Sequence, residues 1–179
     1  MASFHTTDRS SELPPVDEHI APLEMPYEVL DGKLVRVSPS TPEHARCQSK
    51  ISALLEAHVA RSFQVASDML TRTSEKNDFA SDVSVFPRVR DPETGGRHLE
   101  HMAFEVVSSQ TMAFVGRKAA KLVRRGVRRV FAIQTKRDRA LEWSRSRRRW
   151  EELDPTSNIE DLSLAVPLPV AALLTAAEG

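Results

Sequence analysis

The feature that most restricts the fold of this chain is a nearly apolar run of seven residues that contains one carboxylate. Residues 101–107 (HMAFEVV) have the length and composition of a strand that is buried on both faces. Glu105 lies between Phe104 and Val106. A lone carboxylate in such a strand is costly unless a cation or hydrogen-bond donors surround it. The alternative is a glutamate at a strand edge that pairs with an arginine.

A second carboxylate, Asp82, begins an alternating run that predicts another strand over residues 82–86. Residues 91–96 (DPETGG) between the two strands have the composition of a turn. Opposed residues in an antiparallel pair have a constant sum of residue numbers, and a turn centred here places Asp82 opposite Glu105. If both face the same side, their Cβ atoms lie roughly 4.5–5.5 Å apart. Two such carboxylates share a divalent cation, or they repel each other and one pKa rises.

The other elements indicate an α+β fold, in which a mixed β-sheet is flanked by two main helices and preceded by an N-terminal β-hairpin. Thr41 and Gly126 carry the signals for the start of the first main helix and the end of the second. The expected elements are strands at 27–30 and 33–37 around an Asp-Gly turn, a helix from 42 to about 61, short strands at 63–65 and 69–73, a helix at 111–125, a strand at 129–133, a hairpin of 141–144 and 148–153, and a short closing helix at 167–174.

The chain is expected to form one domain. Residues 1–25 are rich in Ser, Thr, Pro and charge without periodicity, which predicts a flexible tail, and residues 26–179 form the single folded domain. Cys47 is the only cysteine, so no internal disulfide can form. No run reaches the length of a membrane span. These features favour the reducing cytoplasm as the location.

Lys118 lies at the border of an apolar stripe on the second main helix. The stripe consists of Val115, Ala119, Leu122 and Gly126. From this border a lysine can reach along the sheet toward Glu105, although ordinary snorkelling to solvent explains the position equally simply. Lys121 is the alternate candidate for the same role.

Positive charge is concentrated in one segment of a chain whose net charge is zero. Residues 117–149 hold 14 lysines and arginines against two acidic residues. Such a split indicates a polyanion such as nucleic acid as a partner. The alternative is that these side chains form solvated faces of a helix and a hairpin.

Several segments resemble the Uma-two family of proposed restriction endonucleases. The run YEVLDGKL, followed by SPSTPEH, is similar to the opening of that family. The segments DVSV at 82–85 and FEVVS at 104–108 are also similar, as is Lys118 followed eight residues later by Gly126. The resemblance covers about residues 25–153. It implies a restriction-endonuclease-like core of the PD-(D/E)XK nuclease-like superfamily, with the lysine displaced from the strand, at Val107, to the following helix.

The resemblance implies a metal-dependent endonuclease that hydrolyses phosphodiester bonds of DNA. Asp82, Glu105 and the backbone carbonyl of Val106 would bind Mg²⁺ or Mn²⁺, hard ions that prefer oxygen ligands. The bound ion would activate a water and neutralise charge on the scissile phosphate. Lys118 would orient the attacking water or stabilise the transition state.

His44 and Glu28 match family positions near the cleft and are accessory candidates without an assigned role. The chain departs from the family pattern at three positions, where it has Ser81, Phe114 and Leu122. The alternative functions are a non-catalytic nucleic-acid-binding module and a scaffold on the same fold. A homodimer would suit the cutting of both strands of a duplex. The sequence leaves open the oligomeric state, the target sequence and the choice between DNA and RNA.

Overall fold

A mixed sheet of eight strands forms the centre of the computed structural model, which describes residues 13–20, 27–37 and 40–178. Its strands follow the order β2-β1-β4-β5-β6-β7-β8, and β3 pairs with β4 beside this path. β5 and β6 are parallel, and the other neighbours in the sheet are antiparallel. The strands are β1 (Tyr27–Leu30), β2 (Lys33–Arg36), β3 (Phe63–Ser74), β4 (Asn77–Pro87), β5 (Met102–Val107), β6 (Arg129–Gln134), β7 (Arg139–Ser144) and β8 (Arg149–Glu152).

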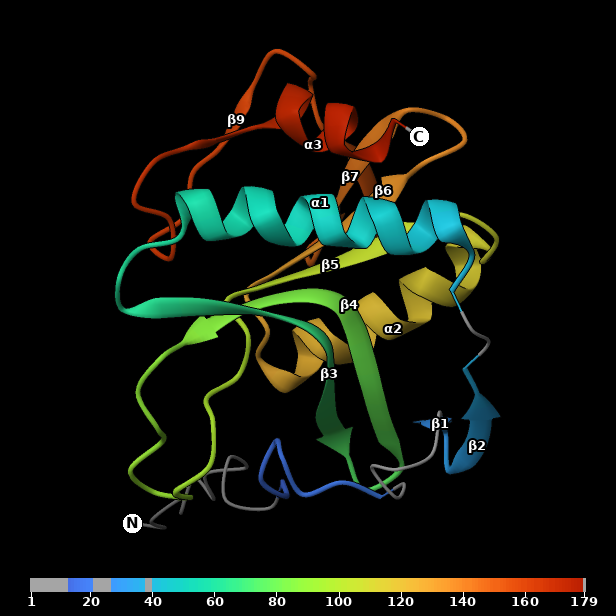
Figure 1. The fold of residues 1–179 in the computed structure, drawn as a ribbon. Coiled ribbons are helices and arrows are strands. Elements are labelled where there is room, and N and C mark those ends of the chain that lie inside the picture. Colours follow the sequence, from blue (N-terminus) through green and yellow to red (C-terminus); the bar gives the residue numbers. More distant parts are fainter. Residues whose placement is uncertain (1–12, 21–26, 38–39, 179) are drawn as a thin grey trace, which may run out of the picture.

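Helices cover both faces of this sheet. α1 (Pro42–His58) and α3 (Val170–Ala177) lie on one face, and α2 (Met112–Arg125) lies on the other (Figure 1). The alternation of β5 matches this arrangement: Met102, Phe104 and Val106 belong to the core under α1 and α3, whereas Ala103 and Val107 pack toward α2. Glu105 shares the parity of the second set, so its side chain faces α2. The predicted α+β class with two main helices is confirmed.

Both main helices begin with a threonine cap. The hydroxyl of Thr41 accepts a hydrogen bond from the backbone N–H of His44, and the hydroxyl of Thr111 accepts one from Phe114, each over 3.3 Å. Pro42 occupies the first helical position of α1. α2 ends at Gly126, whose φ of 130° is a conformation that favours glycine. These signals were readable in the sequence, and the helix starts lie within one residue of their predicted positions.

The register of β4 and β5 is the predicted one. Val83 pairs with Phe104, Ser84 with Ala103 and Val85 with Met102. Each pair has the same sum of residue numbers as Asp82 and Glu105. Continued by one position beyond Val83 and Phe104, where the pairing ends, this register puts Asp82 opposite Glu105.

β3 differs from its prediction, because it is one continuous strand rather than two short ones at 63–65 and 69–73. Ser67 pairs with Val83 and Met69 with Ser81, so Asp68 stands opposite Asp82. Asp68 has a φ of 53°, in the left-handed region that side chains other than glycine seldom adopt. The polar residues Ser67 and Asp68 separate the two predicted strands. In the structure, β3 continues through them, and Asp68 alone takes a left-handed backbone conformation.

The chain ends in a small addition to the α1 face. β9 (Asn158–Ile159) and β10 (Leu168–Pro169) form a two-stranded sheet, and α3 follows directly, three residues later than the predicted closing helix. Leu168, Val170 and Leu173 are buried in the core under α1. Within the described residues, no helix is both long and apolar enough to cross a bilayer.

Part of the segment predicted as a flexible tail lies against β3. Val16 is buried, and its carbonyl accepts a hydrogen bond from Arg72 N over 2.9 Å. The Arg72 guanidinium donates to the carbonyl of Glu18 over 2.7 Å. The rest of the predicted tail, residues 1–12 and 21–25, lies outside the described residues, as do Ser38 and Pro39 in the predicted break after the hairpin.

Candidate active site

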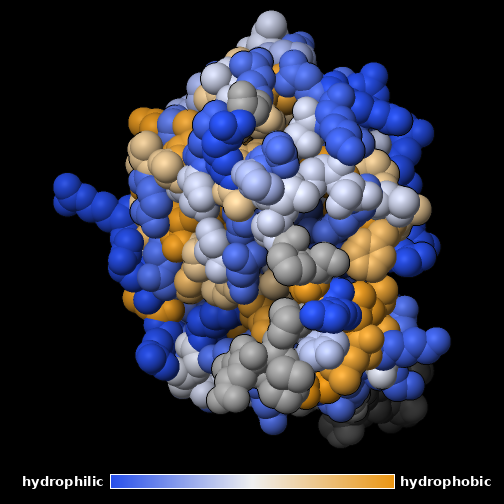
Figure 2. Space-filling view, turned by 45° about the vertical axis from the view of Figure 1, so that its right-hand side comes forward, coloured by the Kyte–Doolittle hydropathy of each residue, from blue (hydrophilic) through white to orange (hydrophobic). Residues whose placement is uncertain are grey.

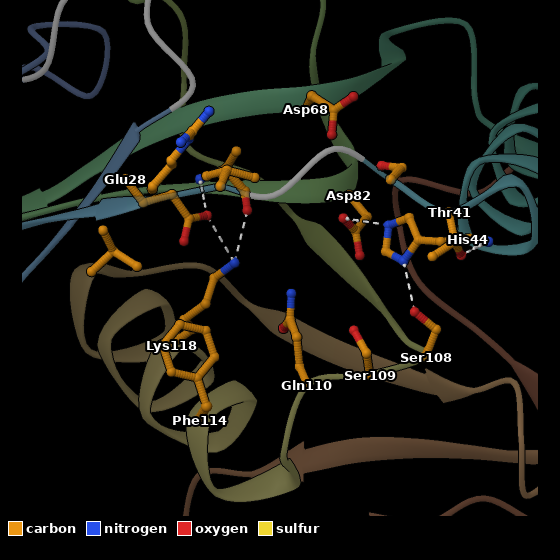
Figure 3. A pocket seen from close by; sticks show the side chains of 15 residues that line it. Glu28, Thr41, His44, Asp68, Asp82, Ser108, Ser109, Gln110, Phe114 and Lys118 are labelled. Atoms are coloured by element: carbon orange, nitrogen blue, oxygen red, sulfur yellow. Dashed lines mark hydrogen bonds and ion pairs between the residues drawn. The ribbon is translucent and has the colours of Figure 1, made fainter.

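A cavity of about 290 Å³ opens where β5 ends and α1 and α2 begin. Its lining includes Glu28 from β1, His44 from α1, Asp82 from β4 and Lys118 from α2 (Figure 3). This side of the molecule faces the viewer in Figure 2, where hydrophilic residues prevail and hydrophobic ones form smaller groups between them. Side chains from four separate elements thus meet in one cavity.

Lys118 is the centre of a buried network of charges. Its ammonium donates to Glu105 Oε2 over 3.1 Å, to Glu28 Oε1 over 3.0 Å and to the carbonyl of Ala80 over 2.9 Å. The Lys118 side chain is 3% exposed and that of Glu105 is 2% exposed. Lys118, which the sequence placed at the border of the apolar stripe, is therefore buried, and Glu28 of the N-terminal hairpin lies against it.

Glu28 joins this hairpin to the site. Its Oε1 accepts a hydrogen bond from the backbone N–H of Ala80 over 3.0 Å, in addition to the bond from Lys118. Val29 pairs with Asp78, so β1 extends the sheet beside the first half of β4. This pairing brings the accessory residue Glu28 into direct contact with Lys118.

Asp82 is held by groups from β5 and α1. Its Oδ2 accepts a hydrogen bond from Val106 N over 2.5 Å, and its Oδ1 lies 3.3 Å from His44 Nε2. The carbonyl of Asp82 accepts a bond from the Gln48 amide over 2.8 Å. The other ring nitrogen of His44 lies 3.4 Å from Ser108 Oγ. His44 therefore bridges Asp82 and the loop that follows β5.

Burial is the main reason that the pKa of Glu105 is raised to about 7; Lys118 opposes this rise, and the nearby carboxylates of Asp82 and Glu28 add to it. Its Oε1 atom is buried and has no hydrogen-bond partner among the described residues. Four carboxylates, those of Glu28, Asp68, Asp82 and Glu105, share the site with one ammonium. An orphaned buried oxygen beside excess negative charge suits a divalent cation with oxygen ligands.

The described residues contain no group of three or more His, Cys, Asp or Glu side chains arranged to hold a metal ion. A cation here would therefore rely on the two carboxylates of Asp82 and Glu105 together with a backbone oxygen such as that of Val106. This is the ligand set that the sequence suggested.

Two basic side chains of the site keep their charge more firmly than usual. Burial lowers the pKa of Lys118, but the Glu105 and Glu28 carboxylates outweigh burial, and the pKa is raised. The hydrogen bond to Asp82 raises the pKa of His44, with smaller contributions of the same sign from the charges of Asp68 and Glu105. At neutral pH Lys118 is therefore a donor of hydrogen bonds and positive charge, and not a base.

Lys121, the alternate candidate for the role of Lys118, points elsewhere. Its ammonium pairs with the carboxylate of Asp31 in the β1–β2 turn. It lies three residues beyond Lys118 on α2, where its ion pair is with the β1–β2 turn. The structure thus brings Lys118, and not Lys121, to Glu105.

Sequence reasoning missed several residues that line the cavity. Asp68, Ser108 and Gln110 all do so, and Figure 3 shows Asp68 across the cavity from Gln110. Asp68 could not be placed from the sequence, because its position depends on the unusual residue within β3. Of the departures from the family pattern, Phe114 lines the cavity, whereas Ser81 and Leu122 are buried.

The basic segment 117–149 is divided between different environments. Arg129 forms a two-pronged pair with Glu142 at 2.6 and 2.8 Å, and Arg139, Arg147 and Arg149 pair with glutamates of β8. The β7–β8 turn at 145–148 lies at the end of the sheet where β5 begins, away from the cavity. The segment is therefore partly neutralised within the sheet and does not form a single patch at the cavity.

Comparisons with known proteins agree on one family and one fold. The sequence profile of Uma2, described as "Putative restriction endonuclease", matches residues 16–177. Among solved structures, a putative nuclease belonging to DUF820 from Anabaena variabilis has a TM-score of 0.69 at 16% identity, over 88% of this chain and 94% of that one. A search of curated proteins finds no match. The structural likeness shows a shared fold.

Proposed function

The chain belongs to the Uma2 family of restriction-endonuclease-like proteins, and from this premise we propose that it is a metal-dependent endonuclease acting on DNA. The observation that carries the proposal is the buried Lys118–Glu105 pair with Asp82 opposite on the neighbouring strand. Asp82 and Lys118 line the cavity, and Glu105 lies buried beside Lys118; together they offer two carboxylates as oxygen ligands for a cation and one fixed positive charge, which suits phosphodiester hydrolysis.

In the proposed site, Asp82, Glu105 and the carbonyl of Val106 hold Mg²⁺ or Mn²⁺. When bound, the ion lowers the pKa of a water and offsets negative charge on the scissile phosphate. The backbone N–H of Val106 fixes one oxygen of Asp82. Glu28 and the Ala80 carbonyl fix the Lys118 ammonium beside Glu105. The donors and acceptors are therefore preorganised before substrate arrives.

Lys118 supplies positive charge beside the substrate phosphate. All three of its N–H donors are engaged with Glu105, Glu28 and the Ala80 carbonyl, so it orients the attacking water or stabilises the transition state by exchanging one of these bonds. Because its pKa is raised, it donates hydrogen bonds and does not remove the proton of the water. His44 acts as a positioning residue: it contacts Asp82 and Ser108, and it keeps the Asp82 carboxylate turned toward the cavity. Glu28 positions Lys118. We place this activity in the cytoplasm, where the free thiol of Cys47 stays reduced.

The test is cleavage of plasmid and of single-stranded DNA with Mg²⁺, Mn²⁺ or EDTA, by the wild type and by Asp82→Asn and Glu105→Gln. These changes keep side-chain size and remove charge. The proposal expects metal-dependent cleavage by the wild type, and loss of cleavage with retained DNA binding in both variants. DNA binding by the wild type without cleavage under any of these conditions would instead support the non-catalytic binding module.

Metal binding by calorimetry separates the steps of this proposal. The wild type is expected to bind Mn²⁺ and Glu105→Gln to bind it far more weakly. Lys121→Gln is the matched control, because it removes a charge from the same helix but from outside the network. If the wild type binds neither Mg²⁺ nor Mn²⁺, even with DNA present, the metal-nuclease reading fails for this chain.

A further inference from the structure

A second hollow, also of about 290 Å³, lies where β4 ends at Pro87. Pro87 is five residues beyond Asp82, so the two positions are about 17 Å apart along the strand. Three of its lining side chains are arginines: Arg88, Arg90 and Arg97. We call this hollow the arginine pocket. It shares no lining residue with the candidate active site.

Two of these arginines stand directly opposite one another. Arg90 and Arg97 form an isolated antiparallel β-bridge that closes the loop between β4 and β5. Like charges at directly opposed positions are destabilising. Both side chains also form hydrogen bonds: Arg90 donates to the carbonyl of Gly95, and Arg97 donates to the carbonyls of His98 and Leu70 and to the hydroxyl of Thr71. These bonds hold two positive charges close together, and a bound anion would offset their repulsion.

The guanidinium groups are held in place by backbone carbonyls. Arg88 donates to the carbonyls of Arg61 over 3.3 Å and Phe63 over 3.1 Å, and Arg90 donates to that of Gly95 over 2.9 Å. Each guanidinium has five N–H donors, so several remain for a ligand. Carbonyl partners fix the orientation of a guanidinium without neutralising its charge.

Acidic side chains compensate part of this charge. Arg97 pairs with the buried Glu100 at 3.6 Å. The carboxylate of Asp17 also lines the pocket, where its Oδ2 accepts a hydrogen bond from the backbone N–H of Arg97 over 3.2 Å. Among the described residues, no carboxylate forms an ion pair with Arg88 or Arg90, so these two arginines keep positive charge available to a ligand.

We propose that the arginine pocket binds a phosphate group of a nucleic-acid backbone. Arginine forks match the geometry of phosphate oxygens and bind them bidentately. The Arg97 guanidinium lies 5.9 Å from the ring centroid of Phe86, and Phe86 and Asp82, an even number of residues apart on β4, project to the same face of the sheet. The choice of nucleic acid rests on the proposed nuclease function, whereas the choice of phosphate rests on the arginines themselves.

The experiment measures binding of labelled single-stranded and duplex DNA in EDTA, where no cleavage occurs, by the wild type, Arg90→Gln, Arg88→Gln and Arg90→Lys. Lys76→Gln, which removes an exposed charge at the β3–β4 turn, is the matched control. Arg90→Gln and Arg88→Gln are expected to weaken binding at least several-fold and to reduce the slope of log K against log salt by about one. Arg90→Lys recovers part of the affinity, and Lys76→Gln behaves as wild type. Thermal unfolding confirms that each variant is folded.

Competition by inorganic phosphate distinguishes the sources of the ligand. If phosphate binds to the wild type and not to Arg90→Gln while DNA affinity is unchanged, the pocket takes a free phosphate compound, and the nucleic-acid assignment is overturned. If folded Arg90→Gln and Arg88→Gln match the wild type in both assays, the pocket itself is overturned. Failure of the nuclease proposal is seen separately, as absent cleavage by a wild type whose DNA binding still depends on Arg90.

Discussion

The Lys118 ammonium lies 3.1 Å from the carboxylate of Glu105, and both side chains are almost completely buried. The same ammonium holds Glu28 at 3.0 Å. One positive charge therefore stabilises two carboxylates that come from the N-terminal hairpin and from a central strand. The removal of either partner leaves charge in the interior without compensation.

Lys118→Met is expected to cost about 3 to 5 kcal/mol of unfolding free energy at neutral pH, because it leaves Glu105 buried without its cation. The loss should be larger at pH 8 than at pH 5. The pKa of Glu105, already raised to about 7, rises further without the lysine. A folded-state pKa of Glu105 above its unfolded-state value means that the fold loses stability as the pH rises toward that folded-state pKa. The loss is greater in the variant, because its Glu105 pKa is higher. Urea unfolding at the two pH values measures this difference.

Lys121→Met is the control for that experiment. Its partner Asp31 is exposed in a turn, and such pairs contribute about 0–1 kcal/mol. The double variant Lys118→Met/Glu105→Gln should recover part of the lost stability. A Lys118→Met loss that is the same at pH 5 and pH 8 would contradict the assigned role of Glu105.

Metal affinity should depend on pH in the range set by Glu105. A proton competes with a cation for this carboxylate, and the pKa of Glu105 is about 7. The affinity for Mn²⁺ is expected to fall by about tenfold per pH unit below 7 and to level off above it. Calorimetric titration with Mn²⁺ between pH 5 and pH 8.5 measures the profile, with the buffer ionisation heat subtracted. An affinity that stays constant down to pH 5 would exclude Glu105 as a ligand.

The titration of His44 should report on its neighbours. Its hydrogen bond to Asp82 raises the pKa, and the charges of Asp68 and Glu105 add to this effect. NMR titration of the metal-free protein is expected to show the largest fall in the His44 pKa for Asp82→Asn and a smaller fall for Asp68→Asn. Because the folded-state pKa of His44 is raised, its interaction with Asp82 stabilises the fold fully below about pH 6.5. This stabilisation is lost as the pH rises through the folded-state pKa of His44. An unchanged His44 pKa in Asp82→Asn would contradict the contact.

Cys47 should be unreactive in the folded protein. It is 2% exposed, and burial raises its pKa to about 11 from a reference value of 9.0. Two pKa units correspond to an about hundredfold smaller thiolate fraction at pH 8, and the thiolate is the reactive form. Iodoacetamide should therefore modify the folded chain at least that much more slowly than the chain in urea. Equal rates in the two states would show that Cys47 is accessible.

The sequence predicted the register of β4 and β5 correctly, because one turn and the period of two residues determine an antiparallel register. It placed Lys118 only at the border of an apolar stripe, and the burial of this lysine depends on the pairing of β1 with β4. That pairing joins segments about 50 residues apart, so the neighbouring sequence does not indicate it. The neighbouring sequence likewise does not indicate the position of Asp68 opposite Asp82, because this position requires a left-handed residue within a strand. The arginine pocket also depends on a loop conformation, and composition alone does not indicate it.

The contact between Glu28 and Lys118 spans 90 residues of sequence, and this separation orders the assembly of the site during synthesis. A nascent chain exposes Glu28 first, then Asp82, then Glu105, and gains the compensating ammonium only when α2 has emerged from the ribosome. Until then the β4–β5 register brings the carboxylates of Asp82 and Glu105 toward one another without a cation to balance them. The charge network of the candidate site is thus completed late, together with the second layer of helix, and chains truncated before α2 carry the acidic residues without the ammonium that balances them.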